Sequence, residues 1–132
     1  MILIDTHVLV WINRSPEKLS RDARRAIERT TRADAAAIAS ITLWELATLV
    51  LRGRIRLKAG TVRTFLDEMV QTPGLTVLEI RAEVAALAAQ FPADFPGDPA
   101  DRLIAATARA HRIPLVTSDE RIQASPLVET IW

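Results

Sequence analysis

The sequence predicts an α/β fold with a mostly parallel central sheet that is flanked by helices. Short apolar runs alternate with stretches of helical period along the whole chain, which is the pattern of a parallel sheet covered on both faces. The 132 residues suffice for one domain with a buried core, but they are too few for two ordinary domains. We therefore expect one three-layer α/β/α domain over residues 1–132.

Five apolar runs have the length of buried strands and end at polar or turn residues. They cover residues 2–4, 35–39, 75–78, 113–116 and 127–131. The run at 35–39 is the weakest of these predictions, because alanine is a poor strand former.

Helices are expected between these runs. They are predicted at residues 21–29, 42–52, 61–71, 81–90 and 100–111, with a short helix or turn beginning at 8–12 and a helical turn at 119–123. Thr42 and Glu45 have the S/T-x-x-E spacing of a capping box, which would open the helix that Gly53 ends. Asp98-Pro99 has the form of an N-cap followed by proline at the first helical position.

Composition excludes several classes of function. The chain has no cysteine, which rules out disulfides, thiolate catalysis and cysteine-ligated metals. No apolar stretch approaches the length of a membrane span, and the first residues lack the features of a secretory signal, so the cytoplasm is the expected location.

The net charge of +1 provides no overall field that would attract nucleic acid. Contacts to RNA would therefore come from local groups of cations, of which there are two: Arg21, Arg24, Arg25, Arg29 and Arg32, and Arg52, Arg54, Arg56 and Lys58. A solvated helix face is the better explanation of the first group. The second group follows a helix end, where cations also suit the helix dipole.

Four acidic residues are expected at one edge of the sheet. Asp5 ends the first strand, Glu45 lies in the first turn of the helix after the second strand, and Asp119 follows the fourth strand. Asp101 joins them because its helix must run antiparallel to the strand that follows it, which places the start of the helix at the carboxyl edge. Ligands of open parallel sheets bind at that edge.

Such a cluster favours a bound cation. Two unit charges about 4 Å apart repel by about 4 kcal/mol at an effective dielectric constant near 20. Mg²⁺ and Mn²⁺ prefer oxygen ligands, and Mg²⁺ usually keeps several waters. A bound divalent ion lowers the pKa of its water and stabilises charge on a phosphate, as phosphodiester cleavage requires.

Each acid also has an ordinary explanation. Asp5-Thr6 would be a turn, Glu45 the second half of the capping box, Asp98 a helix cap, and Asp119 the cap of the turn after it. Asp101 suits a helix N-terminus through the dipole. Independent capping gives no reason for these residues to meet at one edge, so the residues together favour an acidic metal site.

Four segments resemble those of the PIN-domain family, and more narrowly of the VapC-type toxin ribonucleases. They are residues 2–11 (ILIDTHVLVW), 41–47 (ITLWELA), 97–108 (GDPADRLIAATA) and 115–122 (LVTSDERI), so the resemblance covers nearly the whole chain. It assigns metal binding and catalysis to Asp5, Glu45, Asp101 and Asp119. Thr6 and Thr117 are weaker candidates for supporting hydroxyls, and the family aspartate falls on Asp101 and not on Asp98.

The resemblance implies an endoribonuclease that depends on Mg²⁺ or Mn²⁺. It further implies homodimers and inhibition by a small antitoxin protein, with transfer, ribosomal or messenger RNA as typical targets. Arg102 would either contact phosphate or neutralise the acidic cluster. Trp11, Trp44 and Trp132 are expected to be core or interface anchors rather than platforms for RNA bases.

Other classes of protein remain as alternatives. A metal-dependent phosphatase or phosphotransfer domain of the dehalogenase-like kind would want an aspartate where His7 stands, and a receiver domain would want a lysine after the late strand. A PIN-fold protein-binding module without turnover is the remaining alternative, and the acids at all four positions argue against it.

Overall fold

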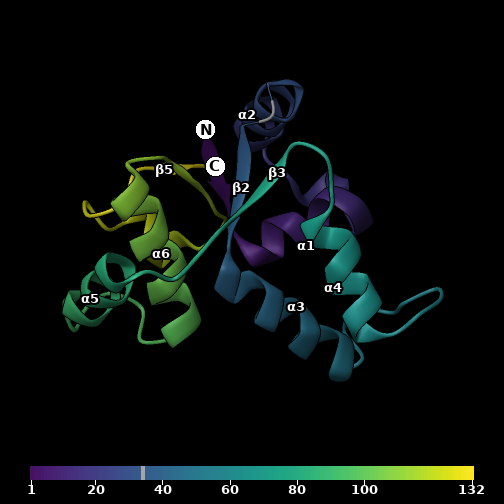
Figure 1. Cartoon of the computed structure of the whole chain (residues 1–132). Helices are drawn as coiled ribbons and strands as arrows, with labels where there is room; N and C mark the ends of the chain where they lie inside the picture. Colours follow the sequence, from purple (N-terminus) through teal and green to yellow (C-terminus); the bar gives the residue numbers. More distant parts are fainter. Residues whose placement is uncertain (34) are drawn as a thin grey trace.

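The computed structural model describes residues 1–33 and 35–132 and contains one five-stranded sheet (Figure 1). Its strands are β1 (Ile2–Ile4), β2 (Ala36–Ala39), β3 (Leu75–Leu78), β4 (Leu115–Val116) and β5 (Thr130–Ile131). They lie in the order β3-β2-β1-β4-β5, and every neighbouring pair is parallel. The prediction of a mostly parallel sheet is confirmed.

Helices connect the strands and cover both faces of the sheet. They are α1 (Thr6–Arg14), α2 (Arg21–Arg32), α3 (Ser40–Leu51), α4 (Val62–Val70), α5 (Ala82–Gln90), α6 (Pro99–His111) and α7 (Glu120–Gln123), with a 3₁₀ turn at Pro16–Lys18. Figure 1 shows the sheet nearly edge-on, with α5 and α6 on one side and α1 and α4 on the other. This arrangement confirms the three-layer α/β/α prediction.

The alternation of side chains along the strands divides the core in two. Leu3 packs with α5 and α6, whereas its neighbours Ile2 and Ile4 pack with α1 and α2 on the opposite face. Small residues let α6 lie close to the sheet, since Ala37 of β2 and Ala105 of α6 are both fully buried in the same cluster. Burial between β1 and β3 therefore overrides the weak strand propensity of the alanine-rich β2.

Most differences from the predicted elements lie at their ends. Strands β4 and β5 have two residues each and are shorter than predicted, and α2 continues to Arg32. The 3₁₀ turn at Pro16–Lys18 was not predicted. Within the described part of the chain, no helix is both long and apolar enough to span a membrane.

The capping box predicted at Thr42 and Glu45 is wrong. Helix α3 starts two residues earlier, at Ser40, directly after β2, and its N-cap residue Ala39 offers no side-chain hydrogen bond. Glu45 consequently lies in the second turn of α3 and not in the first. The side chains of Thr42 and Glu45 are free to contact α1 instead.

Replacing Leu3 by alanine tests the importance of the α6 side of the core. Leu3 is fully buried at the centre of the sheet, so Leu3→Ala should lower the free energy of unfolding by about 3 kcal/mol. Urea unfolding followed by circular dichroism measures the loss. The matched control is Val70→Ala on the exposed side of α4, which should change stability by less than about 0.5 kcal/mol. Equal losses in both variants would contradict the packing described above.

Candidate active site

The site begins where the order of the strands reverses. The chain builds β1, β2 and β3 outward in one direction, then crosses back to place β4 on the other side of β1. Ile4 pairs with Val116, so the next residues, Asp5 and Thr117, leave the sheet side by side. The Thr117 hydroxyl donates a hydrogen bond to Asp5 Oδ2 over 2.6 Å. This is the crevice in which open α/β sheets bind their ligands.

Asp5 is almost completely buried and is held from two directions. Its exposed fraction is 8%, and its Oδ1 accepts a hydrogen bond of 2.8 Å from the backbone N–H of Thr6. Asp5 is thus the N-cap of α1, so its carboxyl lies at the positive end of that helix.

Glu45 reaches the same place from α3. The Thr6 hydroxyl donates to Glu45 Oε1 over 2.6 Å and lies 3.1 Å from the hydroxyl of Thr42. Thr6 and Thr42 are buried, so this contact fixes one carboxylate oxygen of Glu45 in the interior of the molecule. Sequence reasoning missed this role of Thr42, because it depends on how α3 packs against α1.

The start of α6 brings two more carboxyl groups. Asp98 is the N-cap of α6, and its Oδ1 accepts from the backbone N–H groups of Ala100 (2.8 Å) and Asp101 (3.3 Å). The capping role expected for Asp98 is therefore formed. Asp101 stands in the first turn, and within the described part of the chain its carboxyl makes no hydrogen bond and only one long ion pair, 4.0 Å, to Arg121.

Asp119 completes the set from the end of β4. It caps the short helix α7, and its carboxylate pairs with Arg121 over 2.9 Å. Arg121 contacts both Asp119 and Asp101, and sequence reasoning did not single it out as part of the site. The only signal in the sequence is its place two residues after a predicted acid.

The guanidinium of Arg102 is directed away from the carboxylates. Its nitrogens donate to the backbone carbonyls of four residues in the loop before α6, namely Phe91, Pro92, Phe95 and Pro96. This side chain therefore fixes the loop that precedes the Asp98 cap. None of the ion pairs in the described residues involves Arg102, so the expected neutralisation of the acids is not formed, and the expected phosphate contact stays a prediction.

Burial and mutual repulsion raise the pKa of three of these carboxyl groups. Desolvation is the largest cause for Asp5, Glu45 and Asp101, and for Asp101 it combines with repulsion from Asp98 and the other acids to raise the pKa to about 7. Asp119 differs, because hydrogen bonds from Arg121 lower its pKa. The metal-free protein therefore stabilises the charged forms of Asp5, Glu45 and Asp101 less well than water does.

The carboxylate oxygens at this edge are the type of ligand that a hard divalent cation prefers, but they do not surround a closed metal site. Among residues 1–33 and 35–132, no three histidine or acidic side chains converge closely enough to form a ready-made metal cluster. Mg²⁺ usually takes one or two carboxylates together with water, so it needs no closed protein cage. The raised pKa values and the all-oxygen ligands therefore fit such an ion.

The fold and the site together define a parallel α/β protein with an acidic edge, and comparison with known proteins gives its family. The PIN-domain family profile matches residues 2–125. Ribonuclease VapC22 of Mycobacterium tuberculosis is 42% identical over 99% of this chain and 98% of its own. The chain therefore belongs to the PIN-domain family, and the narrower resemblance to VapC-type ribonucleases is confirmed.

Solved structures show the same fold. FitAcB of Neisseria gonorrhoeae shares 25% identity at a TM-score of 0.69, over 98% of this chain and 96% of its own. VapBC2 of Rickettsia felis, bound to a promoter DNA fragment, aligns with a TM-score of 0.72 and 23% identity, over 98% and 97% of the two chains. The likeness to the second structure extends to the fold alone.

The Thr117 hydroxyl stabilises the charged form of Asp5, so its removal should have a pH-dependent cost. Thr117→Val should lower the free energy of unfolding by about 1–3 kcal/mol at alkaline pH, where the buried carboxylate is charged, and by less at acidic pH. Thermal melting of the metal-free protein across this pH range measures the effect. Thr107→Val is the control, because the buried Thr107 hydroxyl donates to the Leu103 carbonyl within α6 and, among the described residues, contacts no acid. An equal, pH-independent loss in both variants would refute the role given to Thr117.

The raised pKa of Asp101 should make the metal-free protein less stable as the pH rises. Asp101 keeps its proton in the folded state up to a pH of about 7, whereas the unfolded chain releases it near the ordinary aspartate pKa of 3.8. The folded state binds more protons between these values, so stability falls as the pH rises through them. Asp101→Asn should remove this fall, and added Mg²⁺ should offset it in the wild type.

Melting temperatures in EDTA at about pH 5 and about pH 8 test this expectation. Asp94→Asn is the control, since Asp94 is an exposed acid in the loop before α6. A wild type and an Asp101→Asn variant with the same pH dependence would show that Asp101 is not under strain in the folded protein.

Proposed function

We propose that this protein is an endoribonuclease that depends on Mg²⁺ or Mn²⁺ and acts as the toxin of a toxin–antitoxin pair. The observation that carries the proposal is the grouping of Asp5, Glu45, Asp101 and Asp119 at one edge of the sheet, where the other three acids repel Asp101 and burial disfavours charge on Asp5, Glu45 and Asp101. The 42% identity to a ribonuclease over almost the whole chain supports RNA as the substrate.

Asp5, Glu45, Asp101 and Asp119 are the residues that would hold the cation. When bound, a divalent ion would lower the pKa of a coordinated water and stabilise negative charge on the phosphate. The hydroxyls of Thr117 and Thr6 each donate to one oxygen of Asp5 and Glu45, respectively, and so fix the orientation of these two carboxyl groups.

Asp101 is the least restrained of the four proposed ligands. Within the described residues its carboxyl makes no hydrogen bond to a hydroxyl, in contrast to Asp5 and Glu45. Its pKa of about 7 lets it exchange a proton near neutral pH in the metal-free protein, and a bound cation would hold it in the charged form. Arg121 pairs with Asp119 and reaches toward Asp101, so it restrains both acids on the side of α7.

We further propose an antitoxin protein as the regulatory partner, homodimers of this chain, and cytoplasmic RNA as the target. A toxin–antitoxin complex from Klebsiella pneumoniae, which has the same fold at a TM-score of 0.65 and 21% identity over 97% of this chain and 95% of its own, supports the first of these. The protein also offers an apolar cavity of about 380 Å³ between α1 and α4, lined in part by Leu9, Ile12, Phe65 and Met69. Burial of such a surface would favour a protein partner.

Cleavage of cellular RNA by the purified, partner-free protein is the direct test. RNA should be cut in the presence of Mg²⁺ or Mn²⁺ and left intact in EDTA. Asp5→Asn should lower the rate by at least about a hundredfold, because it removes one of the charged ligands at the centre of the site.

Asp67→Asn is the matched control, since Asp67 lies on the exposed side of α4 and pairs with Arg63, and this variant should cut at the wild-type rate. Calorimetric titration with Mn²⁺ should show binding to the wild type and much weaker binding to Asp5→Asn. Equal cutting by wild type and Asp5→Asn, or no metal binding by either protein, would exclude the proposed site.

A further inference from the structure

An acidic site needs cations elsewhere to hold RNA, and this inference rests on the function proposed above. The carboxylates at the sheet edge repel phosphates, and the whole chain has a net charge of only +1. Nucleic-acid affinity comes largely from contacts between phosphates and basic side chains. The chain must therefore concentrate some of its cations near the site.

Such a group lies where α1 and α3 end. We call it the cationic cluster, and its members are Arg14, Arg52, Arg54, Arg56 and Lys58, all of them exposed. The Arg14 Nη2 atom donates to the backbone carbonyl of Arg56 over 3.2 Å, which joins the end of α1 to the segment after α3. None of the ion pairs found within the described ranges involves a member of the cluster.

The segment after α3 is anchored so that its cations face solvent. Ile55 is 3% exposed and Leu57 is half-buried, and both pack in the core on the α1 side of the sheet. The alternating residues Arg54, Arg56 and Lys58 are exposed. The charges are therefore displayed on a fixed segment rather than on a loose loop.

Two helices connect the acidic edge to the cationic cluster. Helix α1 starts next to Asp5 and ends at Arg14, about 14 Å further along its axis at 1.5 Å per residue. Helix α3 carries Glu45 and ends beside Arg52, about 10 Å further on. A few nucleotides of single-stranded RNA are enough to reach from the acidic edge to the cationic cluster.

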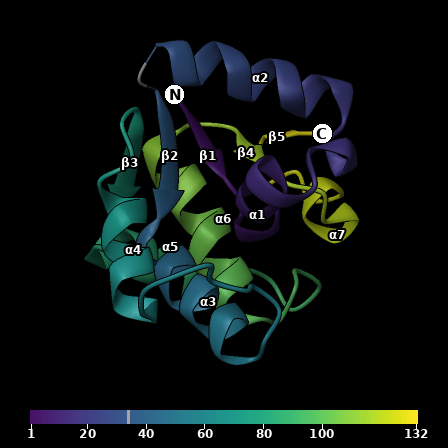
Figure 2. The ribbon, with the colours of Figure 1, turned by 90° about the vertical axis from the view of Figure 1, so that its right-hand side faces the viewer.

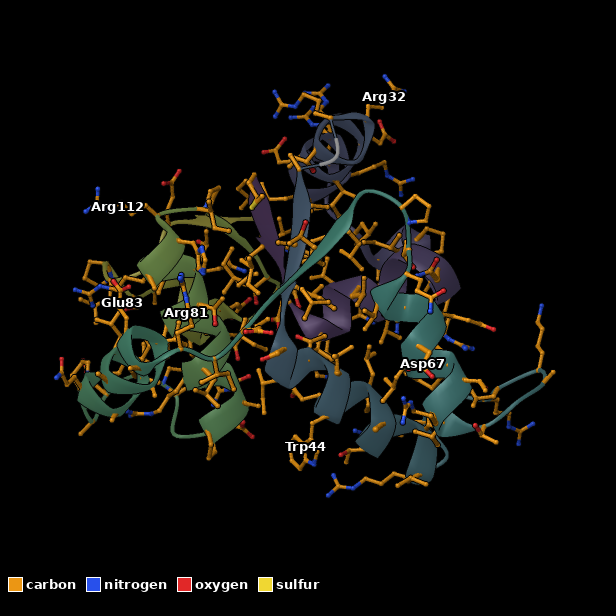
Figure 3. All side chains as sticks on the ribbon, in the orientation of Figure 1. Arg32, Trp44, Asp67, Arg81, Glu83 and Arg112 are labelled. Carbon is orange, nitrogen blue, oxygen red and sulfur yellow. The ribbon has the colours of Figure 1, made fainter. Side chains whose placement is uncertain are left out.

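The outer face of α3 presents an aromatic ring one residue before Glu45. Trp44 is 62% exposed and Leu51 is 78% exposed, and with Thr48 they occupy positions i, i+4 and i+7 of one helix face. Figure 3 shows the Trp44 side chain projecting from α3 into solvent, away from the sheet. Trp44 is therefore not part of the core, in contrast to Trp11 and Trp132, whose rings pack against each other at 5.9 Å.

We propose that the outer face of α3 and the cationic cluster form a binding track for single-stranded RNA. A base beside the scissile phosphate stacks on Trp44, and the phosphates that follow contact the cluster. Aromatic platforms next to basic side chains are the usual means of holding single strands. The other basic helix, α2, lies across the molecule from α3, and acidic side chains of Asp22 and Glu28 interrupt its arginines (Figure 2).

RNA binding is measured in EDTA, where metal-dependent cleavage should not occur, so that the binding track is tested separately from catalysis. Fluorescence anisotropy with a labelled single-stranded RNA of mixed sequence gives the affinity at several salt concentrations. Trp44→Ala should weaken binding about tenfold, and Trp44→Phe should retain most of the affinity. The double variant Arg54→Gln/Arg56→Gln should lower the slope of log affinity against log salt concentration by the amount expected for the loss of about two phosphate contacts.

The matched control is Arg25→Gln/Arg29→Gln, which removes the same charge from the exposed face of α2. It should leave the affinity nearly unchanged. Intrinsic fluorescence adds a direct signal, because RNA should quench the tryptophan emission of the wild type and this quenching should be lost in Trp44→Phe. Circular dichroism confirms that each variant is folded.

Three results would overturn the track. The first is an equal loss of affinity in the α2 control, and the second is unchanged RNA binding by Trp44→Ala. The third is dissociation of an oligomer by Trp44→Ala without loss of RNA affinity, which would make this face a contact between copies of the chain. Metal-dependent cleavage is measured on the same samples, so a wild type that still cuts RNA would leave the proposed function intact in each case.

Discussion

The parallel pairing of β1 with β4 decides where the Asp5 carboxyl lies. Strand β1 is three residues long and β4 only two, yet their register sets Asp5 against Thr117 at the point where the strand order reverses. Because α1 starts directly after β1 and α3 directly after β2, the same edge also fixes Thr6 and Glu45. A shift of β4 by one residue would turn its side chains to the other face and remove the Thr117 hydroxyl from Asp5.

That arrangement stores unfavourable electrostatic energy in the metal-free protein. Asp5 is buried, and Glu45 and Asp101 are desolvated in part, so charge on all three is disfavoured. Hydroxyl groups limit the cost for Asp5 and Glu45, and in the described residues no buried side-chain polar atom lacks a partner. A core optimised for stability alone would place apolar residues here, so the arrangement is best explained by a ligand that offsets the charge.

The fold was largely predictable from the sequence, because buried strands and amphipathic helices have different periods. The site was predictable as a set of acids at one edge, since that conclusion needs only strand order and direction. The contacts that these acids make could not be predicted from the sequence. Thr42 and Glu45 match a capping box in the sequence, but α3 begins earlier and turns both side chains toward Thr6. The partners of Arg102 and Arg121 likewise depend on loop geometry, which no periodic pattern records.

Separating the acidic site from the cations has a physical advantage. If Arg54 or Arg56 stood within the crevice, its guanidinium would pair with the carboxylates and compete with a divalent ion for the same oxygens. Arg121 shows this effect at the rim, where it already lowers the pKa of Asp119. Cations placed about 10 Å away along a rigid helix avoid such pairing while they remain within reach of one bound strand. The near-neutral net charge of the chain therefore conceals two opposed local fields, of which the acidic one suits a metal ion and the basic one suits a nucleic-acid backbone.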